Sequence, residues 1–215
     1  MKLIIANKNY SSWSLRAWLA LRASGQHFTE EQILLGQPDT REQILQFSPS
    51  GRVPCLIDGT EVVWDSLAII EYLAESFPQL WPSNRSDRAH ARSISAEMHS
   101  GFPALRSQLP MNIRKHSPKQ ERSAEVDADI ARIVQIWNEC RALHGSDGPY
   151  LFGKFSSADA MFAPVCFRFA SYGVEPAGLA GTYLATMLAN PAIREWQAEA
   201  EHETAIVAAD ELPNK

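Results

Sequence analysis

An acidic residue and a serine stand side by side where a helix is expected to begin. After Asp65 and Ser66, apolar residues recur at the spacing of one helix face, at Ile69, Ile70, Leu73 and Phe77. Asp and Ser both cap helix N-termini well, and the free backbone N–H groups there attract anions. Together these groups can hold a zwitterion, with Asp65 on its ammonium group and Ser66 and the amides on its carboxylate. The alternative is that both residues only cap the helix.

A proline step and a hairpin precede this helix. Pro54 is expected to keep Val53 extended with its backbone groups pointing outward, and an X-Pro bond is the usual place for a cis peptide. Residues 55–57 and 60–63 read as two antiparallel strands. Asp58 and Gly59 between them are typical of a type I′ turn.

The residues before the hairpin read as strand, helix, strand and short helix. The strands are expected at residues 2–6 and 28–35, and the helices from residue 15 to Gly25 and over residues 40–47. With the hairpin and the helix at Asp65, the order is βαβαββα. One right-handed parallel crossover followed by an antiparallel hairpin gives a small mixed sheet with helices on both faces, which is the thioredoxin-like arrangement.

The second part of the chain has helical periodicity throughout. Pro78, Pro82 and the polar residues 83–86 indicate a linker, so we expect an α/β thioredoxin-like domain over residues 1–80, a linker over 81–86 and an all-α domain over 87–215. Pro103 is expected to break the helix that starts the second domain. Ser156 and Asp159 have capping-box spacing ahead of a buried helix.

The composition excludes several classes of partner. The chain has 215 residues, 45% of them hydrophobic, and a net charge of −5, so nucleic acid and anionic membranes are not expected partners. We expect a cytoplasmic protein, because neither a signal-peptide layout nor a run of 18 apolar residues is present. The three cysteines are expected to be reduced, and the six histidines lack metal-ligand spacing, so no metal is expected.

Three features in this order, the Val53-Pro54 step, the Asp65-Ser66 pair and an all-helical second domain, make the chain resemble the cytosolic glutathione transferases. The resemblance covers nearly the whole chain, and residues 152–159 are similar to the family's helix-capping motif. It implies glutathione as co-substrate, with the backbone of Val53 on the cysteinyl part, Asp65 and Ser66 on the γ-glutamyl end, Arg52 and Pro54 beside them, and no metal. A surface role for Arg52 is equally open.

The resemblance also implies a hydroxyl near the start of the first helix that stabilises the glutathione thiolate. The sequence from Tyr10 to Ser14 is similar to the serine-using, zeta-like branch, which makes Ser11 the first candidate, Ser12 the second and Tyr10 the third. A thiol with a pKa of about 8.5 is mostly protonated at neutral pH, and a donated O–H hydrogen bond favours the thiolate. Capping of the first helix is the alternative role for both serines.

A hydrophobic acceptor site is expected across the cleft, and its candidate residues are Trp13, Met98, Phe102 and Met111. The expected activity is glutathione transfer to a small hydrophobic electrophile by a homodimer. The alternatives within the enzyme class are a glutathione-dependent isomerase or peroxidase. The alternative from another class is a non-catalytic module that binds glutathione or a protein.

Overall fold

The computed structural model describes residues 1–118 and 121–211, so residues 119–120 and 212–215 of the predicted second domain lie outside the described residues. The strands are β1 (Lys2–Ile5), β2 (Thr29–Gln32), β3 (Cys55–Asp58) and β4 (Glu61–Trp64). The first helices are α1 (Ser12–Ser24), α2 (Thr40–Leu45) and α3 (Ser66–Ser76). The later helices are α4 (Arg85–Ser100), α5 (Pro103–Gln108), α6 (Ala124–His144), α7 (Ser157–Tyr172), α8 (Gly178–Ala189) and α9 (Pro191–His202). Short 3₁₀ segments lie at Pro78–Leu80, Gly145–Asp147 and Ala208–Asp210.

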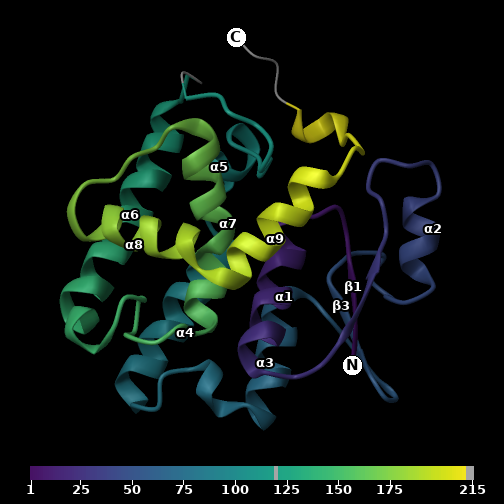
Figure 1. The fold of residues 1–215 in the computed structure, drawn as a ribbon, viewed down its shortest axis with the longest axis horizontal. Coiled ribbons are helices and arrows are strands. Elements are labelled where there is room, and N and C mark those ends of the chain that lie inside the picture. Colours follow the sequence, from purple (N-terminus) through teal and green to yellow (C-terminus); the bar gives the residue numbers. More distant parts are fainter. Residues whose placement is uncertain (119–120, 212–215) are drawn as a thin grey trace.

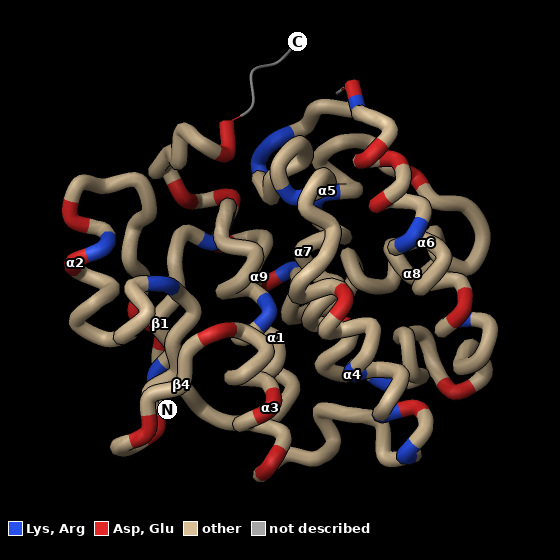
Figure 2. Tube along the Cα trace, turned by 180° about the vertical axis from the view of Figure 1, so that it is seen from behind, with Lys and Arg blue, Asp and Glu red and all other residues tan. Residues whose placement is uncertain are grey.

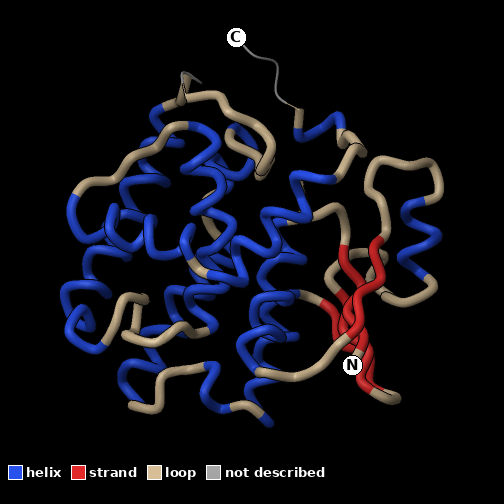
Figure 3. The backbone as a smooth tube through the Cα atoms, viewed as in Figure 1, coloured by secondary structure: helices blue, strands red, loops and turns tan. Residues whose placement is uncertain are grey.

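The strands, red in Figure 3, form one mixed sheet. Their order is β2-β1-β3-β4. β1 pairs with β2 in parallel and with β3 antiparallel, and β3 and β4 form the hairpin. Alternation along β1 separates the two faces, because side chains of a strand point to opposite sides. Leu3 and Ile5 enter the main core, whereas Ile4 packs with Ile44 of α2. In Figure 1, α2 lies on the side of the sheet away from α1 and α3.

The hairpin turn differs from the prediction by one residue. Asp58 pairs with Glu61, so the two turn residues are Gly59 and Thr60 and not Asp58 and Gly59. Gly59 has a φ of 60°, whereas Thr60 is not among the described residues with positive φ. A type I′ turn needs positive φ at both central positions, and a glycine at the first position alone is what a type II′ turn requires. The predicted type I′ turn is therefore wrong.

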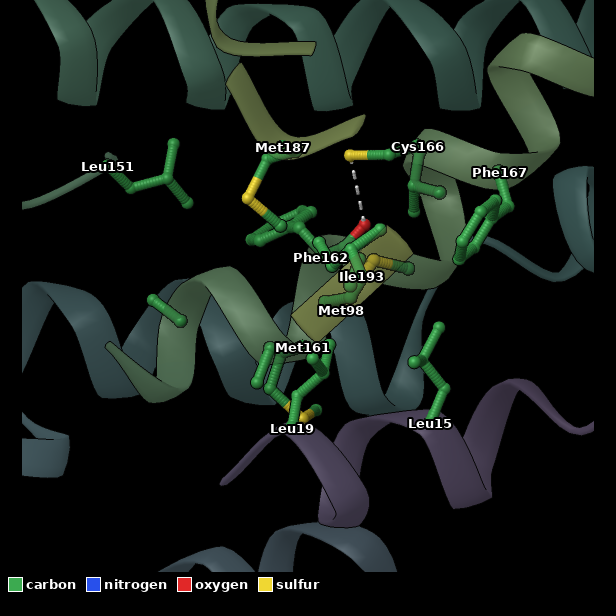
Figure 4. Packing of buried hydrophobic residues seen from close by; sticks show 14 of the residues in the cluster. Leu15, Leu19, Met98, Leu151, Met161, Phe162, Cys166, Phe167, Met187 and Ile193 are labelled. Carbon is green, nitrogen blue, oxygen red and sulfur yellow. Dashed lines mark hydrogen bonds between the residues drawn. The ribbon is translucent and has the colours of Figure 1, made fainter. Parts of the chain in front are cut away.

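The helices after β4 share one core with the first part of the chain. α1 packs against α3 and α7, and α4 also packs against α7. Figure 4 shows Leu19 of α1 pointing toward Met161 of α7, and both side chains are buried. This arrangement agrees with the predicted α/β part followed by an all-helical part, and the domain boundaries themselves stay a prediction. Over the described ranges, none of the helices combines the length and apolar character needed to span a bilayer.

Two local predictions in the helical part are confirmed. α4 ends at Ser100 and α5 begins at Pro103, so the helix breaks at the expected proline. The capping box of α7 forms, with the Asp159 carboxylate accepting from the Ser156 backbone N–H at 2.8 Å. The same carboxylate accepts from the Leu151 N–H and the Tyr183 hydroxyl, so it ties the preceding loop and α8 to the start of α7.

Candidate functional site

A cavity of about 500 Å³ lies at the N-terminus of α3, and we call it the α3 cavity. Its lining residues come from the first helix, the loop before β3 and the β4–α3 junction: Trp13, Ser50, Arg52, Val53, Pro54, Trp64, Asp65 and Ser66. Every residue that the sequence assigned to glutathione lines this cavity. The Val53-Pro54 bond is cis, as expected for the residue pair that enters β3.

Asp65 divides its carboxylate between two directions. Oδ1 accepts from the backbone N–H groups of Leu67 at 2.9 Å and Ala68 at 3.2 Å, so Asp65 caps α3. Oδ2 lies 3.3 Å from Nε2 of His99, a residue of α4. The backbone of Asp65 has a φ of 76°, a conformation that Asp and Asn tolerate better than most residues. The cap is therefore real, and one carboxylate oxygen is not used by it.

Two neighbouring groups on the cavity wall are left without partners. The Ser66 hydroxyl is buried, and its Oγ has no hydrogen-bond partner in the described structure. The backbone N–H and carbonyl of Val53 likewise bond to none of the described residues. A buried hydroxyl such as that of Ser66 is normally paired, and Val53, which is half-buried, leaves both of its backbone groups open on the cavity wall.

The two candidate serines differ in what their hydroxyls already do. Ser11 is the N-cap of α1, and its Oγ donates to Ser14 Oγ at 2.7 Å and accepts from the Ser14 N–H. Ser12 is the first residue of α1, and its hydroxyl makes no hydrogen bond to any residue that the structure describes. Both serines line a second cavity. The Ser12 hydroxyl is the one available for a ligand.

The third candidate hydroxyl is fully occupied. Tyr10 donates to Glu211 at 2.6 Å and accepts from Arg114 at 3.0 Å. Burial, together with the bond to Glu211, raises the pKa of Tyr10. The loop before α1 is also held by Glu203, whose two oxygens accept from the backbone N–H groups of Lys8 at 2.6 Å and Asn9 at 2.9 Å.

The second cavity, which we call the serine cavity, has a volume of about 690 Å³ and shares Trp13, Arg52 and Val53 with the α3 cavity. Its charged lining residues are Arg41, Arg52, Arg106, Arg168 and Asp210. Four arginines against one carboxylate make this wall strongly positive in a chain of net charge −5. Along the rest of the trace, basic and acidic positions are interspersed (Figure 2).

Trp13 lines both cavities, and two arginine side chains make cation–π contacts with its ring. The guanidinium groups of Arg16 and Arg106 lie 4.6 and 5.0 Å from its ring centroid. Arg16 is almost fully buried, and its Nε and Nη1 have no partner in the described structure. Burial, followed by the charges of Arg106 and Arg168, lowers the pKa of Arg16 well below its ordinary value. Burial and the charge of Arg106 also lower the pKa of Arg168 to about 10.

The four residues predicted for the acceptor site are not all on a cavity wall. Trp13 and Met111 line the serine cavity. Met98 and Phe102 belong to the hydrophobic core and line neither cavity. The lining of the serine cavity therefore carries more charge than the sequence predicted. Within the described ranges, no group of three His, Cys, Asp or Glu side chains is placed to hold a metal.

Three parts of this site were not assigned from the sequence. Arg41, Arg106 and Arg168 of the serine cavity are far apart in the chain, and His99 and Glu203 reach the site from α4 and from the residue after α9. His99 next to Met98 was visible in the sequence as a residue of the first helix of the second part. Nothing in the local pattern indicated its contact with Asp65.

Comparison with known proteins gives the family. The family described as the N-terminal domain of glutathione S-transferase matches residues 10–76. Glutathione S-transferase 1 of Dianthus caryophyllus is 35% identical over 168 residues, which cover 76% of this chain and 75% of that protein. The chain belongs to the glutathione S-transferase family. The resemblance found in the sequence and the predicted fold class are thereby confirmed.

Two further proteins are similar to this chain, one in sequence and one in structure. A probable maleylacetoacetate isomerase of Caenorhabditis elegans is 34% identical over 96 residues, and the match spans 44% of this chain and 44% of that protein. A glutathione transferase homolog from Burkholderia GL BGR1, crystallised with bound glutathione, has a TM-score of 0.68 at 21% identity and covers 94% of this chain and 98% of that chain. At this identity the structural likeness speaks for the fold.

Proposed function

We propose that this protein is a glutathione transferase of the serine type. The α3 cavity holds glutathione, and the serine cavity holds a small electrophile. Dependence on glutathione follows from the family, while the transfer reaction and the roles of single residues are our proposal. The observation that carries it is that Ser12, Val53 and Ser66 keep unpaired hydrogen-bonding groups on two adjoining cavity walls.

Each unpaired group matches one part of the tripeptide. The Val53 backbone pairs with the cysteinyl residue, the Ser66 hydroxyl donates to the γ-glutamyl carboxylate, and Asp65 Oδ2 accepts from the γ-glutamyl ammonium group. Arg52 lines both cavities and is placed for a carboxylate of either ligand. The cysteinyl sulfur then lies near the start of α1.

We assign the thiolate contact to Ser12 and keep Ser11 as the alternative. Ser12 donates its O–H to the sulfur, and the positive end of the α1 dipole adds to the stabilisation of the anion. The thiolate attacks the electrophilic carbon, a C–S bond forms, and the leaving group departs with its electron pair. Ser12 gives up no proton in this step, so it acts as a hydrogen-bond donor throughout.

Retention on immobilised glutathione followed by a conjugation assay with an aryl halide tests the proposal. We expect retention and turnover that consumes one thiol for each product. Retention without turnover of any electrophile or peroxide supports a non-catalytic binding module. Failure to be retained contradicts both functions.

A second candidate is a glutathione-dependent isomerase that acts on an anionic substrate. The four arginines of the serine cavity favour it, because carboxylate groups suit such a wall better than a purely apolar acceptor does. Similarity to a probable maleylacetoacetate isomerase also supports an isomerase function. An isomerase returns the thiol after each turnover, whereas a transferase consumes it.

The fate of the thiol and the charge of the substrate separate the two candidates. With an unsaturated cis-dicarboxylate at saturating glutathione, an isomerase forms the trans product without loss of thiol. Arg41→Met is then expected to lower kcat/KM by about tenfold for the dicarboxylate but not for its dimethyl ester. Arg194→Met, which removes the same charge from an exposed position of α9, is the control. Equal losses for both substrates contradict an anionic acceptor site.

A further inference from the structure

The Asp65 carboxylate lies close to a residue from the helical part of the chain. Its Oδ1 is used by the amides of Leu67 and Ala68, so Oδ2 is the oxygen left for a ligand. The His99 Nε2 lies 3.3 Å from this oxygen. His99 itself lines neither cavity, so it acts on a ligand through residues that do, and Asp65 is the one whose carboxylate it contacts.

The surroundings of His99 fix the state of its ring. Its ring meets Trp13 edge-on, with centroids 5.1 Å apart and planes at 83°. Nδ1 is buried and has no partner in the described structure, while Nε2 faces Asp65. A neutral ring with its proton on Nε2 leaves only a lone pair at the unpartnered Nδ1 and puts the N–H on the nitrogen that lies 3.3 Å from Asp65 Oδ2.

Protonation of His99 is disfavoured for a structural reason. It would place a second N–H at Nδ1, where no acceptor lies, and a positive charge near Arg16 and Arg106. Burial is the largest cause that lowers the pKa of His99, the two arginines lower it further, and Asp65 raises it. The net direction is below the ordinary value of about 6.5, so His99 is neutral at pH 7.

We propose that His99 is a positioning residue for glutathione, which as a neutral Nε2–H donor holds the Asp65 carboxylate toward the ammonium group of the ligand. The inference rests on the proposed function of Asp65. When His99 becomes protonated, a cation lies 3.3 Å from Oδ2 and competes with the ligand's ammonium group for the same carboxylate. Glutathione binding therefore weakens as the pH falls through the pKa of His99.

The contribution of His99 to protein stability is also expected to decrease as the pH falls. The pKa of His99 is lower in the folded chain than in the unfolded chain, so the unfolded chain takes up the proton first as the pH falls. The contribution of His99 to stability is fully present above about pH 6.5 and is lost as the pH falls through its pKa in the folded chain.

Calorimetric binding of glutathione between about pH 5 and pH 8 tests the proposal with three variants. His99→Gln keeps an N–H donor near the position of Nε2, His99→Leu removes it, and His27→Leu changes an exposed histidine as the control. At pH 7.5 we expect Kd to rise about tenfold in His99→Leu and to stay within about twofold in His99→Gln and His27→Leu. The loss of affinity at low pH should disappear in His99→Gln. Unchanged affinity in His99→Leu, or a pH profile shared by His99→Gln and wild type, overturns the proposal.

Two further measurements separate this inference from the function on which it rests. For glutathione acetylated on its α-amino group, His99→Leu should weaken binding little further, because the contact that His99 supports is already absent. A loss of affinity equal to that measured with unmodified glutathione contradicts the proposal. In the ligand-free protein, the His99 ring titration followed by NMR should shift to lower pH in Asp65→Asn, since the charge that raises its pKa is gone. If wild type fails to bind glutathione while this shift is seen, the proposed function is wrong and the His99–Asp65 coupling stands; an unchanged titration overturns the coupling.

Discussion

At the scale of single residues, Asp65 caps α3 and is the residue to which we assign the ligand's ammonium group. Its Oδ1 caps α3, and its Oδ2 is the oxygen that we assign to the ligand's ammonium group. Asparagine separates the two tasks, because it caps helices about as well as aspartate and tolerates positive φ but carries no charge.

Asp65→Asn is expected to keep the free energy of unfolding within about 0.5 kcal/mol and to raise the Kd for glutathione by about tenfold or more. Asp65→Ala should lose the affinity and also about 1 kcal/mol of stability, because the cap is removed. Thermal unfolding and calorimetric binding measure the two effects. Full glutathione affinity in Asp65→Asn would leave capping as the only role of this residue.

The two serines at the start of α1 should respond in opposite ways. Ser12→Ala removes the unpaired hydroxyl, so kcat is expected to fall by about ten- to a hundredfold with little change in stability. Ser11→Ala removes the N-cap and is expected to cost about 1 kcal/mol of stability with a smaller effect on kcat. Conjugation kinetics at saturating glutathione distinguish them. The reverse pattern would move the thiolate contact to Ser11.

At the scale of the elements, the start of α7 depends on one buried carboxylate. Asp159 accepts from Leu151, from Tyr183 and from both the N–H and the hydroxyl of Ser156. These contacts join the loop before α7, the helix itself and α8. The element is therefore held by a single side chain that sequence spacing identified.

Asp159→Ala leaves these donors unpaired in the core and is expected to lower the free energy of unfolding by roughly 3 kcal/mol or more. Chemical denaturation measures the loss. Asp39→Ala, at an exposed position that makes no cap hydrogen bond to α2, is the control and should change stability by less than about 1 kcal/mol. A small effect at Asp159 would mean that water replaces the carboxylate.

The elements were predictable to the extent that their signals are local. The cis step at Val53-Pro54, the cap at Asp65 and the box at Ser156 rest on residues within a few positions of each other, and all are found. The hairpin turn was predicted one residue too early, because Asp58-Gly59 and Gly59-Thr60 both contain a glycine. Strand pairing, which the local pattern does not contain, decided between them.

At the scale of the whole molecule, distant segments meet around the serines. The arginines of the serine cavity span residues 41 to 168, and Met98 and Phe102, predicted for the cavity, lie in the core instead. Periodicity assigns a residue to a helix face, but only the packing of the helices decides which cavity that face reaches. For this reason the charge of the serine cavity could not be predicted from the sequence.

The C-terminal segment is part of the same arrangement. α9 packs against α1 (Figure 1), and Glu203 just after it accepts from the backbone of Lys8 and Asn9. Glu203→Gln replaces one acceptor oxygen by an N–H donor facing the loop. We expect a loss of about 1–3 kcal/mol in stability and a lower kcat, because the loop that positions Ser12 is loosened.

Glu201→Gln, two residues earlier and exposed, is the matched control for the Glu203 variant and should leave both stability and kcat unchanged. Thermal unfolding and conjugation kinetics are measured for both variants. Wild-type kcat in a destabilised Glu203→Gln would show that the loop keeps its geometry without this support.

We propose that the start of α1 stabilises a glutathione thiolate. Titration of the bound thiol, followed by its ultraviolet absorbance, tests this role. The structure predicts a pKa at least about one unit below the free value of about 8.5 in wild type, and a return toward that value in Ser12→Ala. A bound thiol that titrates near 8.5 in wild type would contradict the claim.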